Sequence, residues 1–158
     1  MADDQTDFNM KGIDDLLKAL KNPPMARVGI LGSDASQAHG DGGSTNAQIG
    51  ACHEYGTANL PIRSFLMMPI SVFLFKRAQK AGFFDKETLA RVLRERSLVS
   101  FVKKFAVLAE GIVGEAFASN GFGTWVPHSP HYKNNTGMIL VDTQQLRNSI
   151  TSDVEGEG

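Results

Sequence analysis

The chain has 158 residues, of which 42% are hydrophobic and 21% charged, and its net charge is −1. This length is enough for one domain with a core, and the composition is ordinary for a folded soluble protein. One cysteine excludes an intrachain disulfide and fits folding and assembly in a reducing cytoplasm, and no apolar run is long enough to cross a membrane. The acidic start, residues 1–4, lacks the basic and apolar parts of a signal peptide.

The charge is unevenly distributed. Residues 63–104 contain ten basic and three acidic residues, a net charge of +7, so the remainder carries −8. A solvated basic helix face explains such a region. A surface that binds the acidic part of a neighbouring subunit also explains it. DNA contact is a third explanation, but basic and aromatic residues do not alternate here as in single-strand binders.

The first elements are predicted by periodicity. Residues 7–21 are expected to form a helix that ends before two prolines, because their apolar residues follow the i, i+3, i+4, i+7 spacing. These residues are Ile13, Leu16, Leu17 and Leu20. Residues 25–31 favour a strand, and residues 32–45, rich in Gly, Ser and Asp, a flexible loop.

Three further helices are expected beyond that loop. Residues 46–55 favour a short helix that Gly56 ends. A proline at the first turn opens a helix over about residues 69–81, and another follows over about 86–96.

The C-terminal part has one long helix, from Ser97 or Ser100 to about Ala118. Residues 138–141 favour a short strand, 143–148 a helical turn and 150–154 a terminal strand. Together these elements predict an α+β fold, a small antiparallel sheet packed against several helices. We expect a single domain over 1–158 with a mobile loop at 32–45 and a frayed tail at 152–158.

No catalytic group emerges from the residue spacing. Cys52, His53 and Glu54 are consecutive, so on a helix their side chains diverge and cannot meet at one ion or form a nucleophile–base pair. His128 and His131 are separated by three positions among prolines, which do not favour a helical metal pair. We therefore expect no enzyme, metal or cofactor; a metal-dependent hydrolase using these residues would purify with stoichiometric zinc.

The remaining polar residues suit an architectural role. Glu54 and Arg63 flank the loop containing Gly56 and Pro61, and an ion pair between them would hold that loop while Phe65 enters the core. Asp142 suits the N-cap of the predicted helical turn, which leaves Arg147 to reach another element or a neighbouring subunit. We expect Arg63 and the Asp142–Arg147 segment to matter more for assembly than for the fold.

Two separated runs resemble one family. The first reads Ala-x-Ile-x-x-x-His-Glu-Tyr-Gly-Thr over 47–57 and continues as Leu-Pro-Ile-Arg-Ser-Phe-Leu over 60–66. The second reads Asp-Thr-Gln-Gln-Leu-Arg-Asn-Ser-Ile over 142–150, preceded by Trp-Val-Pro at 125–127. Both are similar to runs in the virion morphogenesis proteins of tailed phages. Gln144 departs from this pattern, since the family commonly has glycine there.

The resemblance implies a virion protein of the neck or tail-completion type, assembled in the host cytoplasm into a six- or twelve-fold ring that joins head to tail. Its partners would be copies of itself, the head connector or adaptor, and the tail tube or terminator, with possible non-specific DNA contact and no membrane. The residues expected to fix the loop or contact partners are His53, Glu54, Tyr55, Gly56, Pro61, Arg63, Phe65, Asp142, Leu146 and Arg147. A tail terminator, a minor tail protein capping the tube, and a basic nucleic-acid-binding module are the alternatives.

Overall fold

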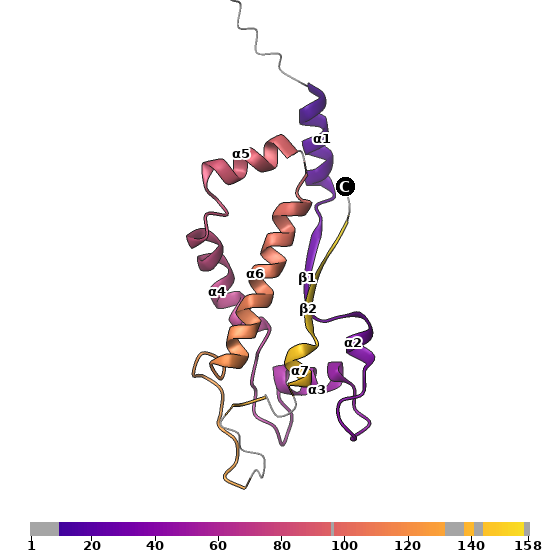
Figure 1. The fold of residues 1–158 in the computed structure, drawn as a ribbon, viewed down its shortest axis with the longest axis vertical. Helices are drawn as coiled ribbons and strands as arrows, with labels where there is room; N and C mark the ends of the chain where they lie inside the picture. Colours follow the sequence, from indigo (N-terminus) through magenta and orange to yellow (C-terminus); the bar gives the residue numbers. More distant parts are fainter. Residues whose placement is uncertain (1–9, 96, 132–137, 141–143, 157–158) are drawn as a thin grey trace, which may run out of the picture.

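The computed structural model describes residues 10–95, 97–131, 138–140 and 144–156. These residues form seven helices and a two-stranded antiparallel sheet (Figure 1), which confirms the predicted α+β class. The elements are α1 (Met10–Lys21), β1 (Met25–Ile30), α2 (Gly32–Ser36), α3 (Asn46–Tyr55), α4 (Met67–Lys80), α5 (Lys86–Glu95), α6 (Val99–Ala118), α7 (Gln145–Asn148) and β2 (Ile150–Glu155). No helix of the described ranges is long and apolar enough to cross a lipid bilayer.

The sheet joins the two ends of the described chain. β1 pairs with β2 from Met25 opposite Glu155 to Ile30 opposite Ile150. Since side chains alternate along a strand, Arg27 lies on the same face as its partner Asp153, and the two form a bidentate ion pair. Ser152 lies on the other face, where its hydroxyl donates a 2.7 Å hydrogen bond to Glu110 of α6. One face of the sheet is thus charged and the other packs on α6.

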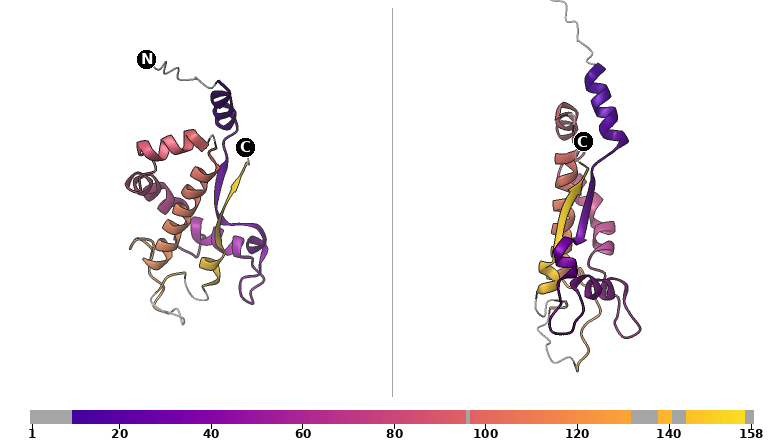
Figure 2. Two further views of the ribbon diagram at one scale, coloured as in Figure 1. Left: turned by 45° about the horizontal axis from the view of Figure 1, so that its top comes forward. Right: turned by 90° about the vertical axis from the view of Figure 1, so that its right-hand side faces the viewer.

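Helix α6 is the centre of the fold. It lies between the strands and α4 in Figure 1 and in the left view of Figure 2, and it packs on both. Small and apolar residues recur at helical spacing along its buried side, which lets neighbouring elements approach closely. The buried residues of α6 are Ala106, Ala109, Ile112, Val113, Ala116 and Phe117. Phe65, Trp125, Leu146 and Ile150 complete the core around its C-terminal half.

The other helices gather at opposite ends of the strands. α2, α3 and α7 lie together at the end of β1 where β2 begins (Figure 1). Most of α3 belongs to the first sequence run and α7 to the second. α1 projects beyond the other end of the sheet in every view of Figures 1 and 2. The runs of the family resemblance are therefore at one end of the molecule and α1 is at the other.

Residues 32–45 differ from the expected open loop. Gly32–Ser36 form helix α2, and a bridge pairs Ala38 with Thr45. The polar composition suggested a loop, but the segment obtains its order from hydrogen bonds to Asn46, described below, rather than from apolar burial.

Two C-terminal expectations were wrong. Met138–Leu140 form a turn, with Leu140 at a φ of 62°, so the strand expected at 138–141 is absent from the described part of that range. Residues 152–155 belong to β2 instead of a frayed tail, because β1 supplies their pairing. Residues 141–143, 157 and 158 lie outside the described residues.

A glycine pair near the C-terminal end of α6 gives a matched test of the core. Gly121 and Gly123 both have a positive φ, but a Cβ at Gly121 would lie 2.2 Å from the Trp125 ring, whereas nothing lies within 4 Å of one at Gly123. We expect Gly121→Ala to lower the free energy of unfolding by about 3 kcal/mol and Gly123→Ala by about 1 kcal/mol. Trp125 is the only tryptophan, so its fluorescence measures both variants in urea. Equal losses would contradict this packing.

Candidate functional site

Helix α3 carries the first sequence run, and its start is fixed by a capping box. The Thr45 hydroxyl accepts from the Gln48 amide, and the Gln48 side chain accepts from the Thr45 amide, at 3.3 and 2.9 Å. This Thr-x-x-Gln pattern is a known N-terminal signature that the sequence analysis overlooked. Gly56 ends the helix at a φ of 74°, as expected, and a Cβ there would lie 2.8 Å from Ile62. His53 and Glu54 therefore lie in the last turn of α3, next to the loop that Gly56 begins.

The carboxylate of Glu54 organises the start of α4. It is buried and accepts four hydrogen bonds, one from the Ser64 hydroxyl at 2.6 Å and three from the backbone amides of residues 65, 66 and 67 at 2.9–3.0 Å. Amides at a helix N-terminus have no partner within the helix, and the helix dipole favours a negative charge there. Glu54 therefore locks the chain turn that places Phe65 in the core.

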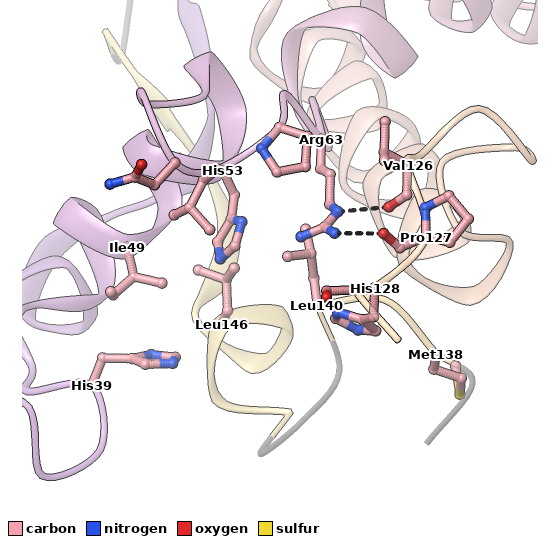
Figure 3. Close-up of a pocket in the computed structure, with 14 residues that line it drawn as sticks. His39, Ile49, His53, Arg63, Val126, Pro127, His128, Met138, Leu140 and Leu146 are labelled. Carbon is pink, nitrogen blue, oxygen red and sulfur yellow. Dashed lines mark hydrogen bonds between the residues drawn. The ribbon is translucent and has the colours of Figure 1, made fainter. Parts of the chain in front are cut away.

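Arg63 fixes the opposite side of the same turn. Its side chain is 5% exposed, and it donates to the carbonyl oxygens of Val126 and Pro127 at 3.0 and 3.3 Å (Figure 3). Trp125, next to them, donates from Nε1 to the Ser64 carbonyl at 3.1 Å. The ion pair expected between Glu54 and Arg63 is thus replaced by two separate sets of bonds to backbone groups. Arg63 joins the first run to the Trp-Val-Pro segment.

Asn46, directly before the first run, bonds to the second run. Its side chain is fully buried; Nδ2 donates to the Asp34 carbonyl at 3.0 Å, and Oδ1 accepts from Gln145 Nε2 at 3.0 Å and lies 2.8 Å from His39 Nδ1. Gln145 also donates to the Ala38 carbonyl at 2.6 Å. Sequence reasoning passed over Asn46, although a polar residue at the start of an apolar helix pattern was a visible signal.

Residues of both runs, together with His39, His128 and Met138 among others, line a cavity of about 640 Å³. Figure 3 shows His39, His53 and His128 facing it from three segments, with Arg63 at its wall. Apolar side chains make up most of the remaining lining, including Ile49, Leu60, Pro61, Val126, Met138, Leu140 and Leu146. Such a cavity has the size of a small-molecule or side-chain pocket.

His53 is a neutral histidine in the wall of this cavity. Its Nδ1 is buried and has no hydrogen-bond partner among the residues that the structure describes. Burial is the main reason that the pKa of His53 is lowered to about 4, and the nearby Arg63, His39 and His128 contribute to the same shift. The imidazole is therefore uncharged at neutral pH.

This buried histidine predicts an acid-sensitive fold. In the unfolded chain His53 binds a proton below its ordinary pKa of 6.5, whereas in the folded chain it does so only below a pKa of about 4. The contribution of neutral His53 to the free energy of unfolding is therefore fully present above pH 6.5 and is lost as the pH falls from 6.5 to about 4. Because the ring is only half-buried, solvent screening limits the loss to about 1–2 kcal/mol. Urea midpoints at pH 7 and pH 4.5 measure it. His53→Gln is expected to reduce the difference between the two urea midpoints, and the exposed His131→Gln to leave it unchanged. If His131→Gln reduced the difference and His53→Gln did not, the acid sensitivity would come from a group other than His53.

The remaining predicted residues fall into three groups. Phe65 and Leu146 are in the core, and Pro61 lines the cavity. Tyr55 is exposed, with its hydroxyl 3.6 Å from the Met67 sulfur, and Arg147 is exposed on α7. Asp142, predicted as an N-cap, lies outside the described residues.

Gln144 precedes α7 in the left-handed conformation, with a φ of 58°. This is the backbone geometry that glycine adopts without strain and glutamine rarely does.

The described residues contain no group of three or more His, Cys, Asp or Glu side chains arranged to hold a metal ion. The one cysteine, Cys52, is half-buried on α3. Comparisons with protein-family models, with curated proteins and with solved structures found no match.

Proposed function

We propose that the chain is a structural protein of a tailed-phage virion, of the neck or tail-completion type, whose copies form a ring that joins head to tail. The observation that carries the proposal is the convergence of the two runs. They are far apart in the sequence, yet Asn46, directly before the first run, bonds Gln145 of the second, and Leu146 is in the same core cluster as Phe65. Two resemblances to one family thus belong to one structural unit.

The backbone at Gln144 supports the same family. A resemblance that arose by chance would not require a left-handed residue at the position where the family has glycine. The second run here has that geometry at the cost of some strain.

The bonding of the motif favours architecture over catalysis. Glu54 directs both oxygens at the donors that start α4, and Arg63 donates to carbonyls of another segment. Groups used in this way position the chain rather than activate a substrate. The exposed apolar side chains of α4 and α5, Phe75 and Leu93 among them, supply surface for contacts between subunits.

The test is to delete the coding sequence from a phage that carries it and to examine lysates by electron microscopy. We expect DNA-filled heads and separate tails of normal length, with infectivity restored by the chain supplied from a plasmid. Tails of irregular length would indicate a tail terminator instead. Joined, infectious particles without the chain would overturn the proposal.

A further inference from the structure

The cavity beside His53 has the dimensions of a small-molecule site. Its volume of about 640 Å³ lies within the range of about 300–1,000 Å³ that is usual for such sites, and it is larger than one inserted side chain. Most of its lining residues are apolar, so the body of a ligand here would contact hydrocarbon. None of the described lining residues is acidic, so a cation would find no counter-charge among them. The cavity therefore suits a largely apolar ligand that is not a cation.

The hydrogen-bonding state of His39 follows from Asn46. The Asn46 Nδ2 atom donates to the Asp34 carbonyl at 3.0 Å and to the Gln37 side-chain oxygen at 3.4 Å, which identifies that end of the amide as the NH₂ group. The Oδ1 atom is then the acceptor, both for Gln145 Nε2 and for His39 Nδ1, which lies 2.8 Å away. A neutral His39 ring thus carries its proton on Nδ1, and its Nε2 atom is an acceptor.

His53 has the opposite polarity. Its Nδ1 atom is buried without a hydrogen-bond partner among the described residues, and a proton there would be an unsatisfied buried donor, which proteins avoid. The neutral ring therefore carries its proton on Nε2, the nitrogen that is not buried. The backbone fixes this ring beside the cavity, since the His53 carbonyl accepts from the Arg63 amide at 2.8 Å.

The two rings give the cavity one acceptor and one donor. Figure 3 shows His39 and His53 at the cavity, with Ile49 and Leu146 beside them. A hydroxyl group both donates and accepts, so it can bond to either ring. A carboxylate only accepts, and it would lose its hydration in a cavity lined mostly by hydrocarbon. A hydroxyl is therefore the polar group that these two nitrogens favour.

The remaining wall favours a flat ligand. Pro61 and Pro127 have rigid rings, and Met138 has a polarizable sulfur that packs well against aromatic edges. An aromatic ring buries a large area on such a wall and loses little conformational entropy on binding.

We propose that the cavity is a binding site for a neutral small molecule with an aromatic body and a hydroxyl group that bonds to His53 or His39. Binding of such a ligand to the isolated chain does not depend on the proposed role in the virion.

Titration of the full chain with 4-ethylphenol at neutral pH tests the proposal. With ¹³C-labelled histidine, we expect the NMR signals of the His39 and His53 rings to shift as the phenol is added. The signal of His131, which is exposed and outside the cavity lining, should stay in place. Ethylbenzene, which lacks the hydroxyl, is expected to bind about tenfold more weakly. The charged analogues 4-ethylbenzoate and 4-ethylbenzylammonium should also bind more weakly than the phenol. Equal affinity for ethylbenzene, tighter binding of either ion, or unmoved His39 and His53 signals would overturn the proposal.

Two variants separate the hydroxyl contact from the fold. His53→Leu removes the donor together with the unpaired Nδ1, so melting should not fall, while the affinity for 4-ethylphenol drops about tenfold to that of ethylbenzene. The matched control, His131→Leu, should leave both affinities unchanged. Leu60→Trp, at a lining position that is 38% exposed, is expected to fill part of the cavity and to weaken both ligands. Unchanged binding of both ligands to Leu60→Trp would place them elsewhere on the chain and contradict the proposal.

A tyrosine derivative tests whether the occupant is instead a side chain of a partner protein. The probe is N-acetyltyrosine amide, whose backbone amides would have to enter apolar surroundings, so we expect it to bind more weakly than 4-ethylphenol. Tighter binding of the tyrosine derivative would mean that the cavity receives a protein side chain, which overturns the assignment of a small molecule.

Discussion

Replacing Glu54 with alanine is expected to lower the free energy of unfolding by about 3–5 kcal/mol, because the change leaves buried amide donors without an acceptor. The carboxylate serves three backbone amides and the Ser64 hydroxyl, and it is 7% exposed, so water cannot fully replace it. Glu54→Gln is expected to cost about half as much. Its side chain keeps one acceptor oxygen, but its NH₂ group would face backbone N–H groups, which are also donors. Urea unfolding monitored by Trp125 fluorescence measures both.

The control for Glu54 is Glu87→Ala, an exposed glutamate in the first turn of α5. Its effect should stay within about 0.5 kcal/mol. A loss below about 1 kcal/mol for Glu54→Ala would mean that the start of α4 does not depend on this carboxylate.

Arg63→Ala is expected to lower the free energy of unfolding by about 2–4 kcal/mol and to detach the segment that carries Val126 and Pro127. The residue is buried, and its guanidinium donates to the carbonyl oxygens of Val126 and Pro127, which would lose these bonds. Arg63→Lys keeps the charge but not the planar fork, so it should recover less than half of the loss. From the sequence, Arg63 was expected to matter more for assembly than for the fold; its burial and its two bonds to backbone carbonyls favour a role in the fold as well.

Arg147→Ala provides the comparison for Arg63. Arg147 is exposed on α7, and its removal should change stability by less than about 0.5 kcal/mol. Its predicted role in assembly is tested by complementation of the deleted phage with the Arg147→Ala chain. Normal melting of Arg63→Ala would contradict the structural role given to Arg63.

Apart from α2, which lies in a segment expected to be a loop, the helices were predictable from sequence because their signals are local. The residues of α3 match the predicted range of 46–55, and Gly56 ends it for the expected steric reason. The start of α4 was expected two residues late, at Pro69, because the signal was the proline; the observed start at Met67 depends on Glu54, which comes from another helix.

The site was less predictable because its partners are backbone groups. A sequence shows that Glu54 and Arg63 have opposite charges, but not that each finds amides or carbonyls brought by a distant turn. The order in residues 34–40 depends likewise on Asn46 and Gln145, whose side chains meet across the fold. The cavity beside His53 exists only once both runs are folded together.

A cryo-EM map of the head–tail junction, from a phage that carries this chain, tests the proposed function most directly. We expect a closed ring of identical subunits between head and tail, six- or twelve-fold, with density that fits α6 packed on the two-stranded sheet. A junction whose rings are all built by other chains, with this chain absent from the particle, would contradict the account.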